Sequence, residues 1–151
     1  MVIIDSPRDL VQWIGKPFPP GEWLTITQAL IDKFADATGD HQWLHCDPER
    51  AARESPFGTT IAHGFLTLSM LPRLRAGLYE VRGTRSGINY GADKLRFTSP
   101  VRCGAKLRLQ ETVREVAPIE GGVRFVSDVV FEIEGEAKPA VVAQTIGLLF
   151  D

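Results

Sequence analysis

The spacing of hydrophobic residues predicts mainly helices in the first half of the chain and strands in the second. From residue 87 onwards, four runs rich in apolar residues follow one another. They cover residues 88–97, 107–116, 123–134 and 141–150. In the third run, Val129, Phe131 and Ile133 fall on alternate positions, as expected for a strand with one buried face. The pair Gly121-Gly122 and the segment from Gly135 to Pro139 separate the later runs at hairpin spacing, which predicts three or four sequential antiparallel strands.

A first helix is predicted between Thr27 and Gly39. Thr27 is a good N-cap, and Gly39 supplies a C-terminal break after Thr38. Helical spacing places four apolar residues on the face expected to be buried. These residues are Ala29, Leu30, Phe34 and Ala37.

Two further helices are expected before the strands. Asp47 can cap a short helix over residues 48–54, whose first residue is proline. Residues 63–74, HGFLTLSMLPRL, are apolar almost all round, which predicts a buried helix. The proline-rich residues 15–21 predict a surface segment, followed by a short extended stretch over residues 22–26.

One buried helix followed by antiparallel strands predicts an α+β architecture, in which the sheet wraps around the helix. The 151 residues contain no long linker and no internal repeat, so residues 1–151 are expected to form one domain. An open sheet leaves an edge and a face uncovered. A second copy would cover them, which predicts a homodimer or a larger homo-oligomer.

The composition favours no nucleic acid or membrane as partner. The net charge is −2, with 44% hydrophobic residues. The longest largely apolar stretch, residues 61–71, is far shorter than the roughly 20 residues of a membrane-spanning helix. The first ten residues lack a secretory pattern, and Cys46 and Cys103 are too few for a disulfide scaffold. We therefore expect a cytoplasmic protein with free thiols.

The candidate chemistry is concentrated between the first two helices. Residues 37–52 contain Asp40, His41, His45 and Asp47 within eight positions. An Asp and a His five residues apart can converge on one water molecule if the loop folds back. From spacing alone, Asp40 could equally cap a turn while His45 plays a structural part.

Several motifs resemble those of a known enzyme family. They are TGDHQWLH at residues 38–45, Asp47-Pro48, Ala62-His63-Gly64, and FTSPVRCGAKL at residues 97–107. Together they resemble the hydratase 2 motif of MaoC-like (R)-specific enoyl-CoA hydratases, and in particular the nodulation-protein-N-like branch. The resemblance implies a hot-dog fold, an acyl-CoA (enoyl thioester) substrate, and Asp40 and His45 as the catalytic pair.

The implied reaction makes three chemical demands. Adding water to a 2-enoyl thioester requires a base, a proton for the α-carbon, and stabilisation of charge on the thioester oxygen. Asp40 and His45 can meet the first two demands. The backbone N–H of Gly64, at the start of the buried helix, can meet the third, and the resemblance implies the same role. His63 is a candidate second base or a structural donor, and no metal or redox cofactor is expected.

Two other kinds of site are weighed and disfavoured. His41 and His45, with Cys46 and Asp47 adjacent, have conceivable metal-ligand spacing, but no Glu follows the first His and no distant ligand cluster appears. Cys46 beside His45 could suggest a thiol nucleophile. However, neighbouring residues commonly point apart, and no third orienting group is identifiable.

The strand at residues 88–97 is expected to carry Asn89 and Tyr90 towards the substrate or the dimer face. The scattered basic residues around it are expected to form a solvated face. They are Arg73, Arg75, Arg82, Arg85, Lys94 and Arg96. Two rival functions stay open: a hot-dog thioesterase, and a non-catalytic acyl-CoA-binding subunit. Gln42-Trp43 leaves room for the second, since many members of the family have Asn-Pro there.

Overall fold

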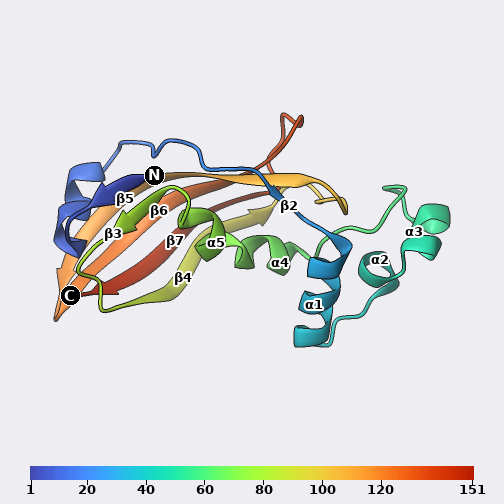
Figure 1. The fold of residues 1–151 in the computed structure, drawn as a ribbon, viewed down its shortest axis with the longest axis horizontal. Coiled ribbons are helices and arrows are strands. Elements are labelled where there is room, and N and C mark those ends of the chain that lie inside the picture. Colours follow the sequence, from blue (N-terminus) through green and yellow to red (C-terminus); the bar gives the residue numbers. More distant parts are fainter.

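A computed structural model describes residues 1–151. Its main feature is a curled five-stranded antiparallel sheet in the order β2-β5-β6-β7-β4 (Figure 1). The strands are β2 (Leu24–Thr25), β4 (Ser86–Phe97), β5 (Lys106–Ile119), β6 (Gly122–Ile133) and β7 (Val141–Phe150). The four strands predicted from the pattern are confirmed, and β5, β6 and β7 follow one another as hairpins. The first of the four, β4, pairs with β7 at the edge of the sheet.

Helices cover the concave face of the sheet and one of its ends. They are α1 (Gln28–Thr38), α2 (Trp43–Cys46), α3 (Pro48–Glu54), α4 (Gly64–Ser69) and α5 (Leu71–Arg75). In Figure 1, α4 and α5 run along the sheet, whereas α1, α2 and α3 lie beyond one end. A sheet with helices across its concave face agrees with the expected α+β hot-dog arrangement. No helix has the length and hydropathy of a membrane span.

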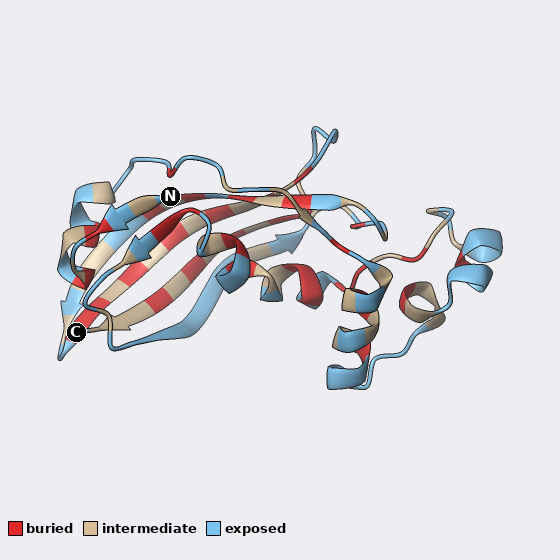
Figure 2. Cartoon of the chain, viewed as in Figure 1, coloured by how far each residue is buried: buried red, intermediate tan, exposed pale blue.

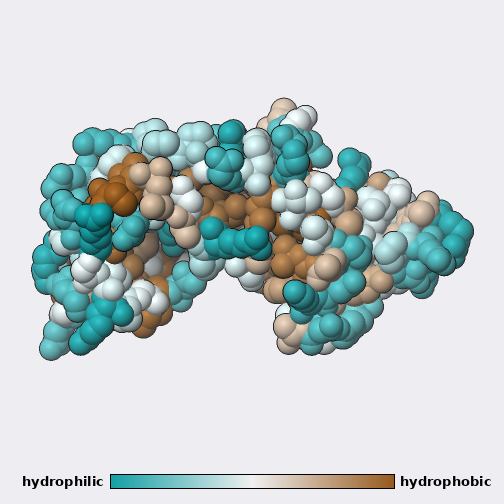
Figure 3. All heavy atoms as spheres, in the orientation of Figure 1, coloured by the Kyte–Doolittle hydropathy of each residue, from teal (hydrophilic) through white to brown (hydrophobic).

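Alternate residues of the strands form the core with the inner faces of the helices (Figure 2). In β6, burial alternates strictly from Val123 to Ile133, as the pattern predicts. Figure 3 shows apolar atoms in the middle of this view of the molecule, where the helices meet the sheet.

The expected single helix over residues 63–74 is instead two short helices. Met70 separates α4 from α5, and Pro72 lies in the first turn of α5. Proline has no N–H to donate, and its ring crowds the carbonyl four residues earlier, so a continuous helix cannot pass through Pro72. Only one face is buried, through residues such as Leu66 and Leu74, while Phe65 is exposed. The prediction of a helix buried all round was therefore wrong.

The N-terminal segment was incompletely predicted. Val2–Ile4 form β1, which pairs in parallel with β3 (Tyr79–Val81), and Pro7–Trp13 form a 3-10 helix. The proline-rich segment does not simply lie on the surface. Phe18 is buried, and its ring stacks between those of Trp13 and Tyr79.

The caps of α1 and α3 are as predicted, but the buried face of α1 is not. Thr27 accepts a hydrogen bond from the Leu30 N–H, and Asp47 accepts one from the Arg50 N–H. In α1 the buried residues are Ile31 and Ala35, with Leu30 and Phe34 beside them. The buried face of α1 is thus rotated about the helix axis from the predicted one, and Ala29 and Ala37 are exposed.

Candidate active site

The chain between α1 and α2 places Asp40 and His45 at one end of the sheet. Gly39 ends α1 in the left-handed region with φ 77°, which turns the chain sharply before Asp40. His45 then lies in α2, a single helical turn. Gln28 fixes this turn by donating from Nε2 to the backbone oxygen of His45 at 2.7 Å, and Thr60 donates to Gln28 Oε1 at 2.5 Å.

The hydrogen bond of His45 determines which of its ring nitrogens carries the proton. Nδ1 lies 2.7 Å from the backbone oxygen of Ile61, and a carbonyl oxygen can only accept. Nδ1 therefore carries a proton, and Nε2 of the neutral ring presents a lone pair. His45 is buried and lines a cavity, and an Nε2 lone pair facing that cavity could accept a proton.

His63 supports both members of the predicted pair. Its ring stacks on that of His45, with the centroids 3.9 Å apart. Its Nε2 lies 3.0 Å from the backbone oxygen of Asp40, so Nε2 must donate. Its Nδ1 is buried and has no partner in the chain. His63 thus connects the loop that carries Asp40 to the helix that carries His45.

Asp40 lies at the mouth of the site. Its side chain is 56% exposed, and one carboxylate oxygen is 3.9 Å from His63 Nε2. The carboxylate and one ring nitrogen each of His45 and His63 lie within 4.8 Å of one another. The loop therefore folds back far enough to bring the Asp40 carboxylate within 4.8 Å of a ring nitrogen of His45. They differ in environment, since His45 is buried and Asp40 faces solvent.

A cavity of about 250 Å³ adjoins His45 and contains the start of α4. Gly64 lines it, and no backbone or side-chain acceptor in the chain takes the N–H of Gly64. A Cβ on Gly64 would lie 2.9 Å from Cδ1 of Phe97, so glycine is required for the observed packing. A carbonyl oxygen in this cavity could accept from the free N–H, and this role for Gly64 stays a prediction.

The structure changes the set of residues that could bind a metal ion. His41 points away and pairs with Asp36 at 2.8 Å, and this hydrogen bond raises the pKa of His41. Asp47 caps α3. The four neighbouring candidates therefore do not converge, whereas Asp40, His45 and His63 do, and these three could hold a small cation. The expectation of a site that works without metal stays a prediction.

The thiol of Cys46 is unsuited to be a nucleophile. Burial raises its pKa, and the charges of Asp32, Asp36 and Asp40 act in the same direction. A raised pKa lowers the fraction of the reactive thiolate at neutral pH.

A second polar cluster was missed by the sequence analysis. Arg75, expected on a solvated face, instead forms an ion pair with Glu111 on the inner face of β5, where the carboxylate is fully buried. The alternation of β5 could have revealed it, because Glu111 falls on the same face as Leu107, Leu109 and Val113.

Comparisons with known proteins agree with the fold and the motif. The family model described as "MaoC like domain" matches residues 9–132. The chain is 48% identical over 147 residues to 3-hydroxyacyl-thioester dehydratase Z of Mycobacterium tuberculosis, covering 97% of each chain. It is 45% identical to nodulation protein N of Rhizobium leguminosarum, covering 95% of this chain and 91% of that protein. The chain belongs to the MaoC-like dehydratase family.

Solved structures agree with the fold. The R-hydratase of Pseudomonas aeruginosa superposes with a TM-score of 0.69 at 26% identity, over 91% of this chain and 82% of that one. The (R)-hydratase of A. caviae superposes with a TM-score of 0.71 at 22% identity, over 89% and 94% of the two chains. The predicted hot-dog fold and MaoC-like family are confirmed, and the protein is accordingly a hydro-lyase.

Proposed function

We propose that this MaoC-like protein catalyses the reversible hydration of a trans-2-enoyl-CoA to an (R)-3-hydroxyacyl-CoA, with Asp40 and His45 as its catalytic pair. One observation carries the assignment of the pair. His45, whose Nδ1 lies at hydrogen-bond distance from the Ile61 oxygen, and Gly64, whose N–H has no acceptor in the chain, line one cavity, and the Asp40 carboxylate lies within 4.8 Å of a ring nitrogen of His45. A base and an oxyanion donor on one cavity fit attack of water on a polarised thioester.

The proposed steps conserve atoms and protons. The oxygen of a water held by Asp40 and His45 bonds to the β-carbon, while one water proton passes to the pair. Electrons of the carbon–carbon double bond move onto the thioester oxygen, which accepts from Gly64 N–H. The electrons then return to the α-carbon, which takes a proton from the pair. Dehydration follows the same path in reverse.

Gly64 and His63 have different parts in this scheme. Gly64 N–H acts where negative charge develops, and one such donor is typically worth roughly 3 kcal/mol in the transition state. His63 acts as a positioning residue, because it contacts the other two groups by stacking on His45 and donating to the backbone of Asp40.

We also propose that the protein works as a homodimer in the cytoplasm. Strand β4 forms an edge of the sheet, and nearly all its residues are exposed. Ile88 and Tyr90 on this strand, and Phe65 on α4, are exposed apolar or aromatic side chains. An edge strand with such side chains is suited to pairing with a second copy.

The proposed reaction is tested by the absorbance of the enoyl thioester with crotonyl-CoA and a longer trans-2-enoyl-CoA. With the wild-type protein, the absorbance of the enoyl thioester should fall without release of free thiol. Asp40→Asn and His45→Gln should each lower kcat by about 100-fold or more. Circular dichroism should show that both variants fold.

Other outcomes identify the rival functions. Release of free thiol would indicate a thioesterase. Acyl-CoA binding without turnover at any chain length would contradict an enzyme and favour a binding subunit. Unchanged kcat in a folded Asp40→Asn variant would exclude this carboxylate from the catalytic pair.

A further inference from the structure

The ion pair between Arg75 and Glu111 lies on the inner face of the sheet, where burying charged groups costs free energy. Arg75 donates from Nε and Nη2 to the two oxygens of Glu111, each at 2.9 Å. Tyr79 Oη donates to the same carboxylate at 3.2 Å. Removing a carboxylate and an arginine from water costs several kcal/mol per ion before their attraction is counted, so an apolar pair would serve packing equally well.

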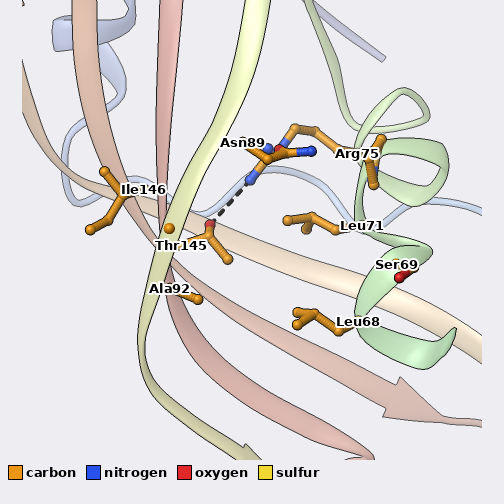
Figure 4. Close-up of a pocket in the computed structure, with 10 residues that line it drawn as sticks. Leu68, Ser69, Leu71, Arg75, Asn89, Ala92, Thr145 and Ile146 are labelled. Carbon is orange, nitrogen blue, oxygen red and sulfur yellow. Dashed lines mark hydrogen bonds between the residues drawn. The ribbon is translucent and has the colours of Figure 1, made fainter. Parts of the chain in front are cut away.

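Part of the hydrogen-bonding capacity of this cluster is unused. Nη2 of Arg75 also donates to Thr145 Oγ1 at 3.3 Å (Figure 4). A guanidinium has five N–H donors, and the two on Nη1 have no partner in the chain. Ser127, the β6 partner of Thr145 in the register, has a buried hydroxyl that also bonds nothing. The Arg75 side chain is 15% exposed, so an acceptor in a cavity beside it could reach the unpaired donors of Nη1.

A cavity of about 370 Å³, lined by Arg75 and Thr145, lies between the helices and the edge of the sheet. Its volume is at the lower end of the range for small-molecule sites. Figure 4 shows Leu68 and Leu71 reaching into it from the helices, opposite Ala92 of β4. Arg75 and Thr145 make one part polar. The cavity therefore combines an apolar section with a hydrogen-bonding end.

This cavity neighbours the one that contains the catalytic pair. Thr67 lines the catalytic cavity and Leu68, the next residue of α4, lines this one. Strand β4 passes both, with Phe97 at the first and Ala92 at the second. The two short helices α4 and α5 carry the chain from Gly64 at the first cavity to Arg75 at the second. An acyl chain whose thioester lies at Gly64 can therefore extend towards Arg75.

We infer that Arg75 is a specificity-determining residue that binds a neutral oxygen, a hydroxyl or ketone, on the far part of the acyl chain. The inference rests on the proposed function and deepens it by naming the class of acyl chain. Glu111 already balances the charge of Arg75, so a carboxylate would bring a second negative charge into the cluster. A neutral acceptor can use the N–H groups of Nη1 without that cost.

The test compares trans-2-enoyl-CoA substrates from hexenoyl to dodecenoyl, each plain and with a terminal hydroxyl. At the length that reaches the cluster, wild type should favour the hydroxylated substrate about tenfold in kcat/KM, the size expected for one hydrogen bond to a charged group. Arg75→Met/Glu111→Gln removes the guanidinium and keeps an acceptor for Tyr79. This variant should lose the preference, whereas Arg73→Met, on the exposed side of the same helix, should keep it.

A second measurement does not depend on any variant folding. Calorimetric titration of wild type with decanoyl-CoA and its terminally hydroxylated analogue should show about tenfold tighter binding of the hydroxylated ligand. Preference for the plain chain at every length, or the same preference in the folded double variant, would overturn the inference. Absence of turnover even with crotonyl-CoA would instead contradict the proposed function, so the two failures are distinguishable.

Discussion

His63 contacts both members of the proposed catalytic pair. Its ring lies against His45, and its Nε2 holds the backbone of Asp40. Because the exposed Asp40 carboxylate has only a long hydrogen bond, of 3.4 Å, from the Gln42 N–H, its position depends on its backbone. The rate should therefore depend on His63 even though His63 need not exchange a proton with substrate.

Replacing His63 should separate positioning from binding. His63→Gln can still donate to the Asp40 carbonyl but loses the ring that packs on His45. Small displacements of catalytic groups commonly cost up to about 100-fold in rate, so we expect kcat to fall 10- to 100-fold with KM little changed. Steady-state kinetics and the pH profile measure this. His41→Gln is the matched control, and equal losses in both variants would contradict a specific part for His63.

Ionisation of Tyr79 makes the free energy of unfolding depend on pH in the alkaline range. Burial and the charge of Glu111 raise its pKa above the ordinary value of 10.0. The unfolded chain therefore loses the Tyr79 proton at a lower pH than the folded protein does. The stabilising contribution is complete below pH 10.0 and is lost as the pH rises between the unfolded and folded pKa values.

Urea unfolding at pH values below and above 10.0 checks this linkage. The free energy of unfolding of wild type should fall over this interval, and that of Tyr79→Phe should fall less. At neutral pH, Tyr79→Phe should cost about 1 kcal/mol, because Glu111 loses one hydrogen bond. Tyr90→Phe, an exposed tyrosine, is the control. Identical slopes for wild type and Tyr79→Phe would refute the assignment.

At the scale of elements, the contact between α4 and β4 defines the catalytic cavity. Gly64 is the first residue of α4, and a Cβ on Gly64 would lie 2.9 Å from Cδ1 of the Phe97 ring. Gly64→Ala should push the Phe97 ring aside and narrow the approach to the backbone N–H. We expect about 100-fold lower kcat/KM, since an oxyanion donor that no longer reaches the substrate typically costs 100- to 1,000-fold.

A double variant tests the physical reason for that loss. Gly64→Ala/Phe97→Ala removes the ring that the new methyl group meets, so it should recover part of the activity lost in Gly64→Ala. Phe97→Ala alone provides the reference. No recovery, with thermal unfolding unchanged, would mean that the ring is not the cause of the loss.

Elements with strong local signals were predictable from the sequence. Thr27 and Gly39 delimit α1, and the four later strands match their apolar runs within about three residues. Local rules also place Asp40 and His45 on the segment between α1 and α3, although they did not predict the single turn α2 that carries His45. The motif, by resemblance, correctly indicated the fold and family.

Features that depend on distant parts of the chain were not predictable in this way. The burial of Phe18 requires Tyr79, which is 61 positions later in the chain. The ion pair of Arg75 requires a carboxylate on β5, and a scattered arginine is normally solvated. The part of His63 depends on a stacking contact with His45 that spacing alone does not reveal. Tertiary contacts thus determine these features, which the local sequence pattern does not predict.

At the scale of the whole molecule, the edge of the sheet and the catalytic site share one strand. Strand β4 pairs with β7 on one side only, and it carries the exposed Ile88 and Tyr90. The same strand ends at Phe97, which packs on Gly64 in the catalytic cavity. Pairing of β4 with a second copy would therefore also fix the position of Phe97.

The coupling of assembly and activity can be measured with Ile88→Glu/Tyr90→Glu. Two carboxylates on the edge strand should oppose pairing through like-charge repulsion and desolvation. Analytical ultracentrifugation should give a dimer for wild type and a monomer for the variant, with kcat/KM at least about tenfold lower because β4 is less ordered at Phe97. Ile14→Glu replaces an exposed apolar residue outside β4, and it should remain dimeric and active. A wild type that is monomeric at the concentrations of the assay, yet fully active, would show that β4 needs no partner and that one protomer holds the complete site.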